Sequence, residues 1–439
     1  MAEVTSNPAK TPLDVKDEEK IVEQVAPPPS TAAVVAPEYD IPDGGYGWVC
    51  IACVAMVNFN TWGCATSYGI YLAYYLNANI FPGASALDFA LIGGLQFAIS
   101  MLLAPIVTPT SRRLKTRPTM AIGIVIMSLG YILAGFANGR VWVLYLTQGF
   151  MVGSGLSFIF VPASAVLPQW FWRRRTMSVG LTSAGAGLGG LVYSLATDPM
   201  IRNLGLPWAL RITGIVAFCC NTVATIFLRD RNKIIKPTQH GFAVYLLKRK
   251  RVLLLLGHAF FVMLGYISVL YSISSFALSL GIDQRRASLA TAFLNLGTTL
   301  GRPFVGLASD RFGRFKVAFW CTFVSGILCF ALWLPTNSYG LLVFLTITIG
   351  LIMGSFWTTI SALTAEVVGI KEVPSALSLV WLSIVLPTAF SEVIALYLRK
   401  PPGSSRQYLY VQIFSGLSYF VSATFMLILW RTKKAPAGP

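Results

Sequence analysis

The sequence predicts an all-α membrane protein with twelve transmembrane helices in two pseudo-symmetric six-helix halves. Three observations support this fold class: the composition, the number of long apolar runs and an internal repeat. Of the 439 residues, 55% are hydrophobic and only 12% are charged, whereas soluble domains carry about 25% charged residues. The composition therefore argues against a soluble enzyme, a nucleic-acid-binding protein and a secreted disulfide-bonded domain.

Twelve apolar runs are long enough to cross a bilayer, since a transmembrane helix needs about 20 such residues. The fifth run is rich in glycine, and the eleventh contains proline. The runs lie near residues 47–76, 86–109, 118–137, 141–168, 176–197, 208–228, 252–280, 286–308, 316–335, 339–365, 373–398 and 407–430.

The distribution of Lys and Arg predicts that both termini are cytosolic. With the N-terminus inside, the inner loops hold 22 Lys and Arg residues and the outer loops hold 7, and such residues favour the cytosolic side. The basic connection 229–251 then separates an N-terminal half, residues 47–228, from a C-terminal half, residues 252–430. Residues 1–46 are expected to form a disordered acidic cytosolic tail, and residues 431–439 a second cytosolic tail.

An internal repeat supports the division into halves. Pro105 and Pro303 are separated by 198 residues, and so are Arg113 and Arg311. The same offset aligns the loop after the second span with the loop after the eighth. A shared offset of this kind indicates a duplicated six-helix unit.

The net charge of +17 arises mainly in short loops between apolar runs, where it orients a membrane protein. No nucleic-acid partner is expected, because the chain has no RNA-binding motif. The expected partners are the lipid bilayer and a small-molecule solute, and the sequence does not indicate an obligate protein partner. Seven cysteines lie within apolar runs and are interpreted as buried thiols, so no metal site is predicted.

Charged residues at the inner mouth predict a conformational gate. A carboxylate and a guanidinium there can pair across helices in one conformation and separate in another. The alternative is a basic loop that only orients the protein. The predicted gate residues are Asp310, Arg311, Arg314, Glu366 and Arg174.

Arg302 is the main candidate for a binding residue, because it lies deep within the eighth span. Its neighbours Gly301 and Pro303 are expected to allow local unwinding around a cavity. A planar, permanently charged guanidinium suits bidentate capture of a carboxylate. The alternative is a structural arginine bonded to backbone carbonyls. Weaker candidates for the cavity lining are Thr66, Asn295, Thr298 and His258.

Two titratable residues within the spans, Glu392 and His258, each have two interpretations. Glu392 either takes up a proton or pairs with the outer residues Arg399 or Arg406. His258 either titrates near neutral pH or is a buried histidine with a satisfied hydrogen bond. The driving ion, if there is one, is expected to be a proton, because no carboxylate cluster suits sodium. No other cofactor is expected.

Three stretches of the chain carry motifs of a known family. Gly306–Arg314, which reads GLASDRFGR, resembles the loop motif G-x-x-x-D-R-x-G-R of the major facilitator superfamily. Asp43–Trp48, which reads DGGYGW, resembles the D-G-G-[WY]-G-W of the monocarboxylate porters within that superfamily, here of the fungal type, and Asp43 is expected to cap the first helix. Trp170–Gly185 resembles the fifth-helix motif Y-F-x-K-R-R-x-L-A-x-G-L-A-x-A-G.

The resemblance covers residues 43–430 and implies the major facilitator fold and secondary-active transport by alternating access. In the porters an arginine matching Arg302 is implicated in binding the substrate carboxylate. Two charged positions of the animal porters are absent here: Thr298 replaces an aspartate and Thr66 replaces a lysine. These departures favour a substrate that is larger, less acidic or more apolar than a small monocarboxylate.

The expected function is therefore transport of a small organic, carboxylate-bearing solute across the cell membrane. An efflux pump that exports a secondary metabolite is the alternative, and a non-transporting membrane receptor is a lesser one. An intramembrane enzyme is not expected, because the chain has only two histidines and no HExxH motif.

Overall fold

The computed structural model describes residues 41–78, 80–235, 241–401 and 406–434. Within these ranges all the regular elements are helices. The predicted tails fall largely outside the described residues, since these exclude residues 1–40 and 435–439.

The N-terminal half contains six membrane-crossing units, several of which are built from two or three consecutive helices. The first and second units are broken at Thr61, Ser67 and Leu103. The helices are α2 (Gly47–Asn60), α3 (Trp62–Thr66), α4 (Tyr68–Ala78), α5 (Ala86–Leu102), α6 (Ala104–Leu114), α7 (Thr116–Ala134), α8 (Val141–Leu144), η1 (Tyr145–Met151), α9 (Val152–Ser164), η2 (Leu167–Gln169), α10 (Arg175–Leu204) and α11 (Leu206–Phe227).

The C-terminal half repeats this plan after a connection that contains two short helices, α12 (Asn232–Ile235) and η3 (Val244–Lys248). Its helices are α13 (Lys250–Ser279), α14 (Gln284–Phe312), α15 (Arg314–Leu328), η4 (Cys329–Trp333), α16 (Tyr339–Met353), α17 (Ser355–Val368), η5 (Ile370–Glu372), α18 (Val373–Ser383), α19 (Val385–Leu398) and α20 (Leu409–Lys434).

The predicted twelve-helix architecture is confirmed. Ten helical segments of the described chain are long and apolar enough to cross a membrane, and an eleventh is the pair Leu87–Leu102 and Ala104–Leu114, bent by 48°. The twelfth is α14, which has 29 residues but a lower hydropathy. Its apolar character is reduced because it carries charged residues such as Arg302 and Asp310.

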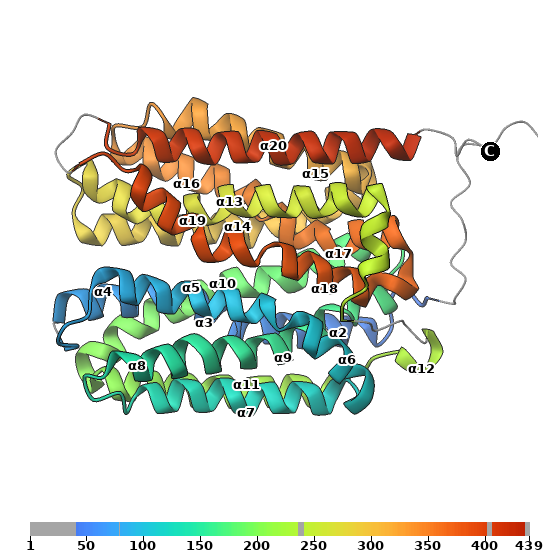
Figure 1. Cartoon of the computed structure of the whole chain (residues 1–439), viewed down its shortest axis with the longest axis horizontal. Coiled ribbons are helices and arrows are strands. Elements are labelled where there is room, and N and C mark those ends of the chain that lie inside the picture. The colour runs from blue at the N-terminus through green and yellow to red at the C-terminus, as the bar shows by residue number, and fades with distance from the viewer. Residues whose placement is uncertain (1–40, 79, 236–240, 402–405, 435–439) are drawn as a thin grey trace, which may run out of the picture. The chain divides into compact units, whose positions relative to one another are not determined.

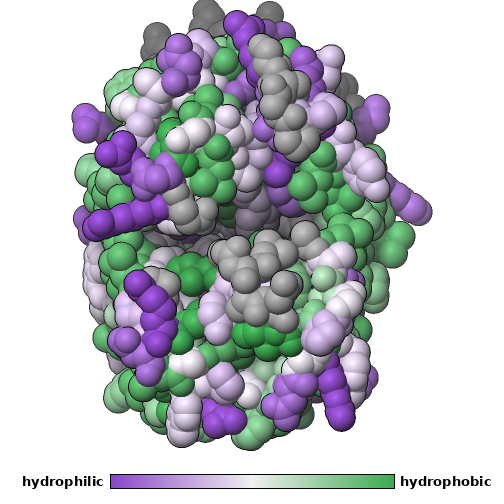
Figure 2. Space-filling view, turned by 90° about the vertical axis from the view of Figure 1, so that its left-hand side faces the viewer, coloured by the Kyte–Doolittle hydropathy of each residue, from purple (hydrophilic) through white to green (hydrophobic). Residues whose placement is uncertain are grey.

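The two halves form two layers of helices, with α13 to α20 in one and α2 to α11 in the other (Figure 1). Helix α10 of the first half packs against α14 and α17 of the second, α5 packs against α19, and α6 packs against α18. Figure 2 shows the end of the bundle that carries α4 and α8, where hydrophilic residues gather around the rim and the face is hollowed between the halves.

Glycine allows the close contact between α10 and α14. A Cβ atom at Gly180 would lie 2.5 Å from the carbonyl oxygen of Arg302, and one at Gly306 would lie 2.8 Å from the carbonyl oxygen of Thr176. Any larger residue at these positions would push the helices apart, since small residues permit close helix approach. The backbone of α10 therefore lies directly against the segment of α14 that carries Arg302.

The expected unwinding of the eighth span is wrong. Helix α14 runs unbroken from Gln284 to Phe312 with Pro303 inside it. Gly301 packs tightly against the backbone of Leu351 in α16. This contact favours regular helix at the proline, because the neighbouring backbone supports the segment on that side.

Candidate functional site

A cavity lies between the two halves and has an empty volume of about 870 Å³, including the space that opens to solvent. Side chains of α2, α3, α5, α9 and α10 line it from the first half, and side chains of α13, α14, α17 and α18 line it from the second. Its position between pseudo-symmetric halves is where transporters of this architecture bind their substrates.

Arg302 lines this cavity and is 7% exposed. Its terminal Nη1 donates a hydrogen bond to the backbone carbonyl of Ser183 in α10, while its Nε has no partner. Among the lining residues that the structure describes there is no Asp or Glu, and no described carboxylate pairs with Arg302. Both interpretations made from the sequence are therefore partly represented: Arg302 lines the cavity, and its guanidinium binds one backbone carbonyl while its Nε has no partner.

Three weaker candidates, Thr66, Asn295 and Thr298, line the same cavity. The hydroxyl of Thr66 donates to the carbonyl of Gly63 at 2.9 Å, and that of Thr298 donates to the carbonyl of Asn295 at 2.8 Å. Each hydroxyl thus donates its hydrogen bond within its own helix, and its oxygen lone pairs remain available to accept one. The two threonines can accept a hydrogen bond from a solute more readily than they can donate one.

His258 does not line the cavity. It is 1% exposed and lies between α13 and α20, where its Nδ1 is 2.8 Å from the hydroxyl of Ser422. The same hydroxyl also lies 2.9 Å from the carbonyl of His258. The structure therefore shows the buried histidine with a satisfied hydrogen bond, because the neighbouring helix supplies its polar partner.

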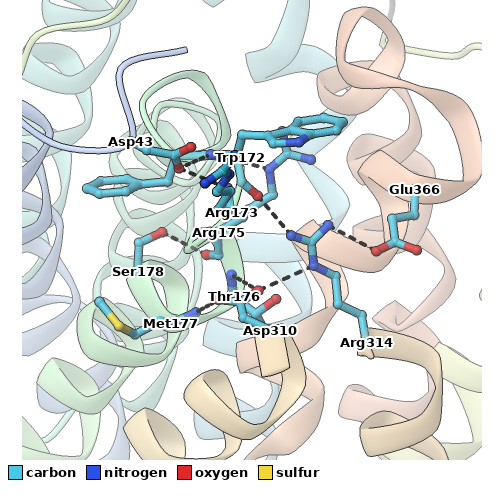
Figure 3. A network of polar contacts seen from close by, with 11 residues as sticks. Asp43, Trp172, Arg173, Arg175, Thr176, Met177, Ser178, Asp310, Arg314 and Glu366 are labelled. Carbon is cyan, nitrogen blue, oxygen red and sulfur yellow. Dashed lines mark hydrogen bonds and ion pairs between the residues drawn. The ribbon is translucent and has the colours of Figure 1, made fainter. Parts of the chain in front are cut away.

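Asp310 joins the two halves by binding the start of α10. Its Oδ1 accepts a hydrogen bond from the backbone N–H of Thr176 at 3.1 Å, and its Oδ2 accepts one from Met177 at 2.8 Å (Figure 3). These amides belong to the first turn of α10, where N–H groups lack intrahelical partners. The carboxylate of α14 thus caps a helix of the opposite half and complements its dipole.

Arg314 extends the same contact from α15. Its Nη1 lies 3.0 Å from Oε1 of Glu366, its Nη2 donates to the carbonyl of Trp172 at 3.0 Å, and its Nε lies 3.4 Å from Oδ1 of Asp310. The three charged side chains are between 11% and 20% exposed, so they are only partly screened by solvent. The contacts to Trp172 and α10 exist only while the halves meet at this end.

We expected from the sequence that Asp43 would cap the first helix, and this expectation is wrong. The residue before α2 is Tyr46, and it makes no side-chain cap. Instead Oδ1 of Asp43 accepts hydrogen bonds from the backbone N–H groups of Trp172 at 2.6 Å and Arg173 at 2.8 Å. Four amides just before and within the first turn of α10 are therefore held by two carboxylates, one from each half (Figure 3).

Two of the predicted gate residues lie outside this network. Arg311 is exposed, with its guanidinium 5.6 Å from the ring centre of Phe312, and Arg174 is also exposed. The arginine that sequence reasoning missed is Arg175, which is 1% exposed and donates to the carbonyls of Phe171 and Pro168. Helical spacing could have identified Arg175 as buried, because it shares a helix face with Ser178 and Thr182, which are both buried.

Glu392 pairs with Arg399, whose Nη2 lies 3.1 Å from Oε1 of Glu392. Their side chains are 23% and 17% exposed. Pairing is one of the two roles considered for this carboxylate, and the ion pair lies near the end of the bundle opposite Asp310. Among the described residues no group of three or more His, Cys, Asp or Glu side chains could hold a metal ion.

Comparison with known proteins identifies the family. The Major Facilitator Superfamily matches residues 50–284 and 253–439. Probable transporter MCH2 of Saccharomyces cerevisiae is 34% identical over 386 residues, which cover 87% of this chain and 81% of that protein. Uncharacterized transporter ESBP6 of the same yeast is 36% identical over 428 residues, which cover 95% of this chain and 63% of that protein.

A more distant relative is the agnestins efflux protein AgnL12 of Paecilomyces divaricatus, 23% identical over 373 residues, 85% of this chain and 84% of that protein. Among solved structures, the fucose:proton symporter FucP of E. coli has the same fold, with a TM-score of 0.68 at 13% identity over 88% of this chain and 99% of that chain. This multi-pass membrane protein belongs to the Major Facilitator Superfamily of transporters.

Proposed function

We propose that the protein is a secondary-active transporter of the monocarboxylate-porter type that moves a small organic, carboxylate-bearing solute by alternating access. The observation that carries the proposal is the environment of Arg302: it is a cation in a cavity whose described lining holds no carboxylate, and its Nε has no partner. A buried, unpaired charge is costly. A carboxylate solute would neutralise it and could bind the guanidinium through two parallel hydrogen bonds.

The contacts around Asp310 support the alternating-access part of the proposal. They join α14 and α15 of one half to α10 of the other, so a path to this end of the bundle requires their separation. The Lys and Arg distribution indicates that this end faces the cytosol. A proton gradient is the proposed driving force, and the cell membrane is the proposed location.

Flux measurements on the purified protein in proteoliposomes test the role of Arg302. Hydrogen bonds to charged groups contribute about 1.5–3 kcal/mol, so Arg302→Ala should lower kcat/KM for an accepted acid by roughly 10- to 150-fold. Arg302→Lys should recover part of the loss, since lysine keeps the charge without the planar fork. Arg285→Ala serves as control, because Arg285 is an exposed arginine of the same helix. Wild-type rates for benzoate and lactate in both Arg302 variants would overturn the assignment.

Export of a secondary metabolite is the second candidate function. The cavity favours it because most of its lining is apolar and aromatic, which suits a larger and less polar solute than lactate. One relative is named as an efflux protein. Accumulation assays in cells with and without the protein distinguish import from export by the sign of the change in internal solute. A protein that binds a solute but moves none in either direction would instead be a receptor.

A further inference from the structure

Aromatic rings from both halves form a continuous wall on the cavity. Trp62 of α3 and Trp357 of α17 have ring centres 5.6 Å apart, and Trp357 stacks on Trp381 of α18 at 5.9 Å with an interplanar angle of 20°. Phe160 of α9 contacts both Trp62, at 5.3 Å, and Trp381, at 5.6 Å. Tyr266 of α13 completes the wall with an edge contact to Trp357 at 6.3 Å.

This wall crosses the boundary between the halves. Trp62 and Phe160 belong to the first half, yet they pack in the hydrophobic cluster formed mainly by the second half. When the halves rock apart, the ring contacts between Trp62 and Trp357 and between Phe160 and Trp381 must separate. A planar aromatic solute that lies in the cavity against rings of both halves adds ring contacts of its own while the halves are together, whereas a saturated solute adds only apolar area.

The same wall carries hydrogen-bond donors that have no partner. The indole Nε1 atoms of Trp62 and Trp381 are buried and unpartnered, although the two residues are only 7% and 2% exposed. The hydroxyl of Ser361 and the Nε of Arg302 are in the same state. All four side chains line the cavity. Buried indole N–H groups usually find a hydrogen-bond partner. The missing partners of these two indoles therefore mark positions where a solute's acceptor atoms can bind.

One acceptor is also free. Asn58 lines the cavity and donates its Nδ2 to the carbonyl of Thr182 at 2.9 Å, while its Oδ1 has no partner. A hydroxyl group satisfies both needs, because its oxygen accepts from an indole and its proton can be donated to Oδ1. The polar groups of the cavity therefore match a solute with a carboxylate and at least one further oxygen.

Resting on the proposed function, we propose that the substrates are planar aromatic carboxylates that carry a hydroxyl or carbonyl oxygen away from the carboxylate. Arg302 binds the carboxylate, the wall formed by Trp62, Phe160, Tyr266, Trp357 and Trp381 encloses the rings, and the indoles of Trp62 and Trp381 bind the additional oxygen. The two indole N–H groups thus determine specificity for oxygenated over unsubstituted rings.

Isothermal calorimetry on the purified full-length protein tests this with five probes of graded chemistry. They are 2-naphthoate, 6-hydroxy-2-naphthoate, decahydro-2-naphthoate, lactate and neutral 2-naphthol. We expect 2-naphthoate to bind at least tenfold more tightly than its saturated analogue, and the hydroxylated acid more tightly still. Equal affinity for the aromatic and saturated acids would overturn the proposal.

Variants that keep the ring and remove the N–H isolate the indole contribution. Trp62→Phe or Trp381→Phe should weaken 6-hydroxy-2-naphthoate binding roughly five- to tenfold more than it weakens 2-naphthoate binding, because both acids lose the same ring area and only the hydroxylated acid also loses a hydrogen bond. Trp320→Phe is the matched control, since this indole is 49% exposed and lies on α15. If neither cavity variant alters the preference for the hydroxylated acid, the assignment of the indoles is wrong.

The probes also separate failure of this inference from failure of the proposed function. If all the acids bind with similar affinity and Arg302→Ala weakens each of them, the anion site stands and only the aromatic class is wrong. If 2-naphthol binds as tightly as 2-naphthoate and Arg302→Ala changes neither, the carboxylate site itself is wrong.

Discussion

Replacing Asp310 by Asn should open the bundle at the end where this residue caps α10. The wild-type carboxylate accepts two backbone hydrogen bonds, from Thr176 and Met177, and it contacts Arg314. Asparagine keeps one accepting oxygen and loses the charge. The lost charge-assisted hydrogen bond is worth about 1.5–3 kcal/mol, and the interaction with the helix dipole about 0.3–1 kcal/mol.

Together these terms give a loss of about 2–3 kcal/mol, since such contributions are not fully additive. At 1.4 kcal/mol per factor of ten, the ratio of the open to the closed arrangement should rise by roughly 30- to 140-fold. Glu366 still pairs with Arg314 in the variant, at 3.0 Å in the present structure. The expected rise in the ratio of open to closed arrangement therefore reflects loss of the Asp310 contacts alone, while the ion pair between Arg314 and Glu366 remains.

Thiol labelling measures this shift. The seven native cysteines are first replaced, and Val179→Cys is introduced as reporter. Val179 is 8% exposed, lines the cavity and lies two residues beyond Met177. A membrane-impermeant maleimide added from the Asp310 end of sealed vesicles should label the Asp310→Asn variant at least 30-fold faster.

Asp283→Asn is the matched control for this experiment. Asp283 caps α14 at its other end, where it accepts a hydrogen bond from the N–H of Arg286 at 3.3 Å, and it contacts no residue of the opposite half in that cap. Its substitution should leave the labelling rate unchanged. Equal labelling rates for Asp310→Asn and the parent protein would refute the assignment of Asp310 as a contact that holds the halves together.

Three further predictions concern packing, histidine and proton coupling. Gly301→Ala should lower the melting temperature by several degrees, since a Cβ atom there collides with the backbone of Leu351, whereas Gly69→Ala, with no atom within 4 Å, should not. His258→Gln should lower the melting temperature without changing the Kd for 2-naphthoate, because the residue binds Ser422 and lies outside the cavity; a changed Kd would contradict this placement. If Glu392 carries the coupled proton, Glu392→Gln should flatten the pH dependence of uptake, and an unchanged pH profile would leave Glu392 with only its ion pair to Arg399.

The fold was largely predictable because its main signal is long-range and repetitive. Twelve apolar runs and a clear Lys and Arg bias need no knowledge of side-chain contacts. Of the twelve spans, α14 is the one that is not apolar enough to count among the candidate membrane helices, yet the apolar run near 286–308 is detectable in the sequence. The local expectation that Gly301 and Pro303 unwind this helix was wrong, because tertiary packing against Leu351 outweighs the intrinsic effect of proline.

The cavity-lining residues were predictable from the sequence because a polar residue deep within a membrane span indicates a cavity or a binding site. Arg302, Thr66, Asn295 and Thr298 all line the cavity, and each lies within a predicted span. The partners of a carboxylate were not predictable, because Asp43 and Asp310 both bind backbone amides, which leave no trace in the residue sequence. The sequence prediction also chose Arg174 as a gate residue, whereas the buried arginine is Arg175. Which of these side chains points inward depends on the residue at which α10 begins, and helix boundaries are uncertain by one or two residues in a sequence.

The binding site and the gate share one rigid element, so they should be energetically coupled. Arg302 and Asp310 lie eight residues apart on α14, which is about 12 Å along a regular helix. Arg302 donates to Ser183 of α10, and Asp310 caps the same helix. A solute that needs walls from both halves binds best while α10 and α14 remain together.

This coupling has a quantitative consequence. When only the closed arrangement binds, the apparent Kd equals the intrinsic Kd divided by the closed fraction. The factor by which Asp310→Asn weakens 2-naphthoate binding should therefore match the fall in closed fraction, measured separately from labelling of the Val179→Cys reporter. Saturating 2-naphthoate should in turn slow that labelling, since coupling between binding and conformation is reciprocal. Faster labelling with an unchanged Kd and no protection by ligand would mean that α14 does not transmit the state of the gate to Arg302.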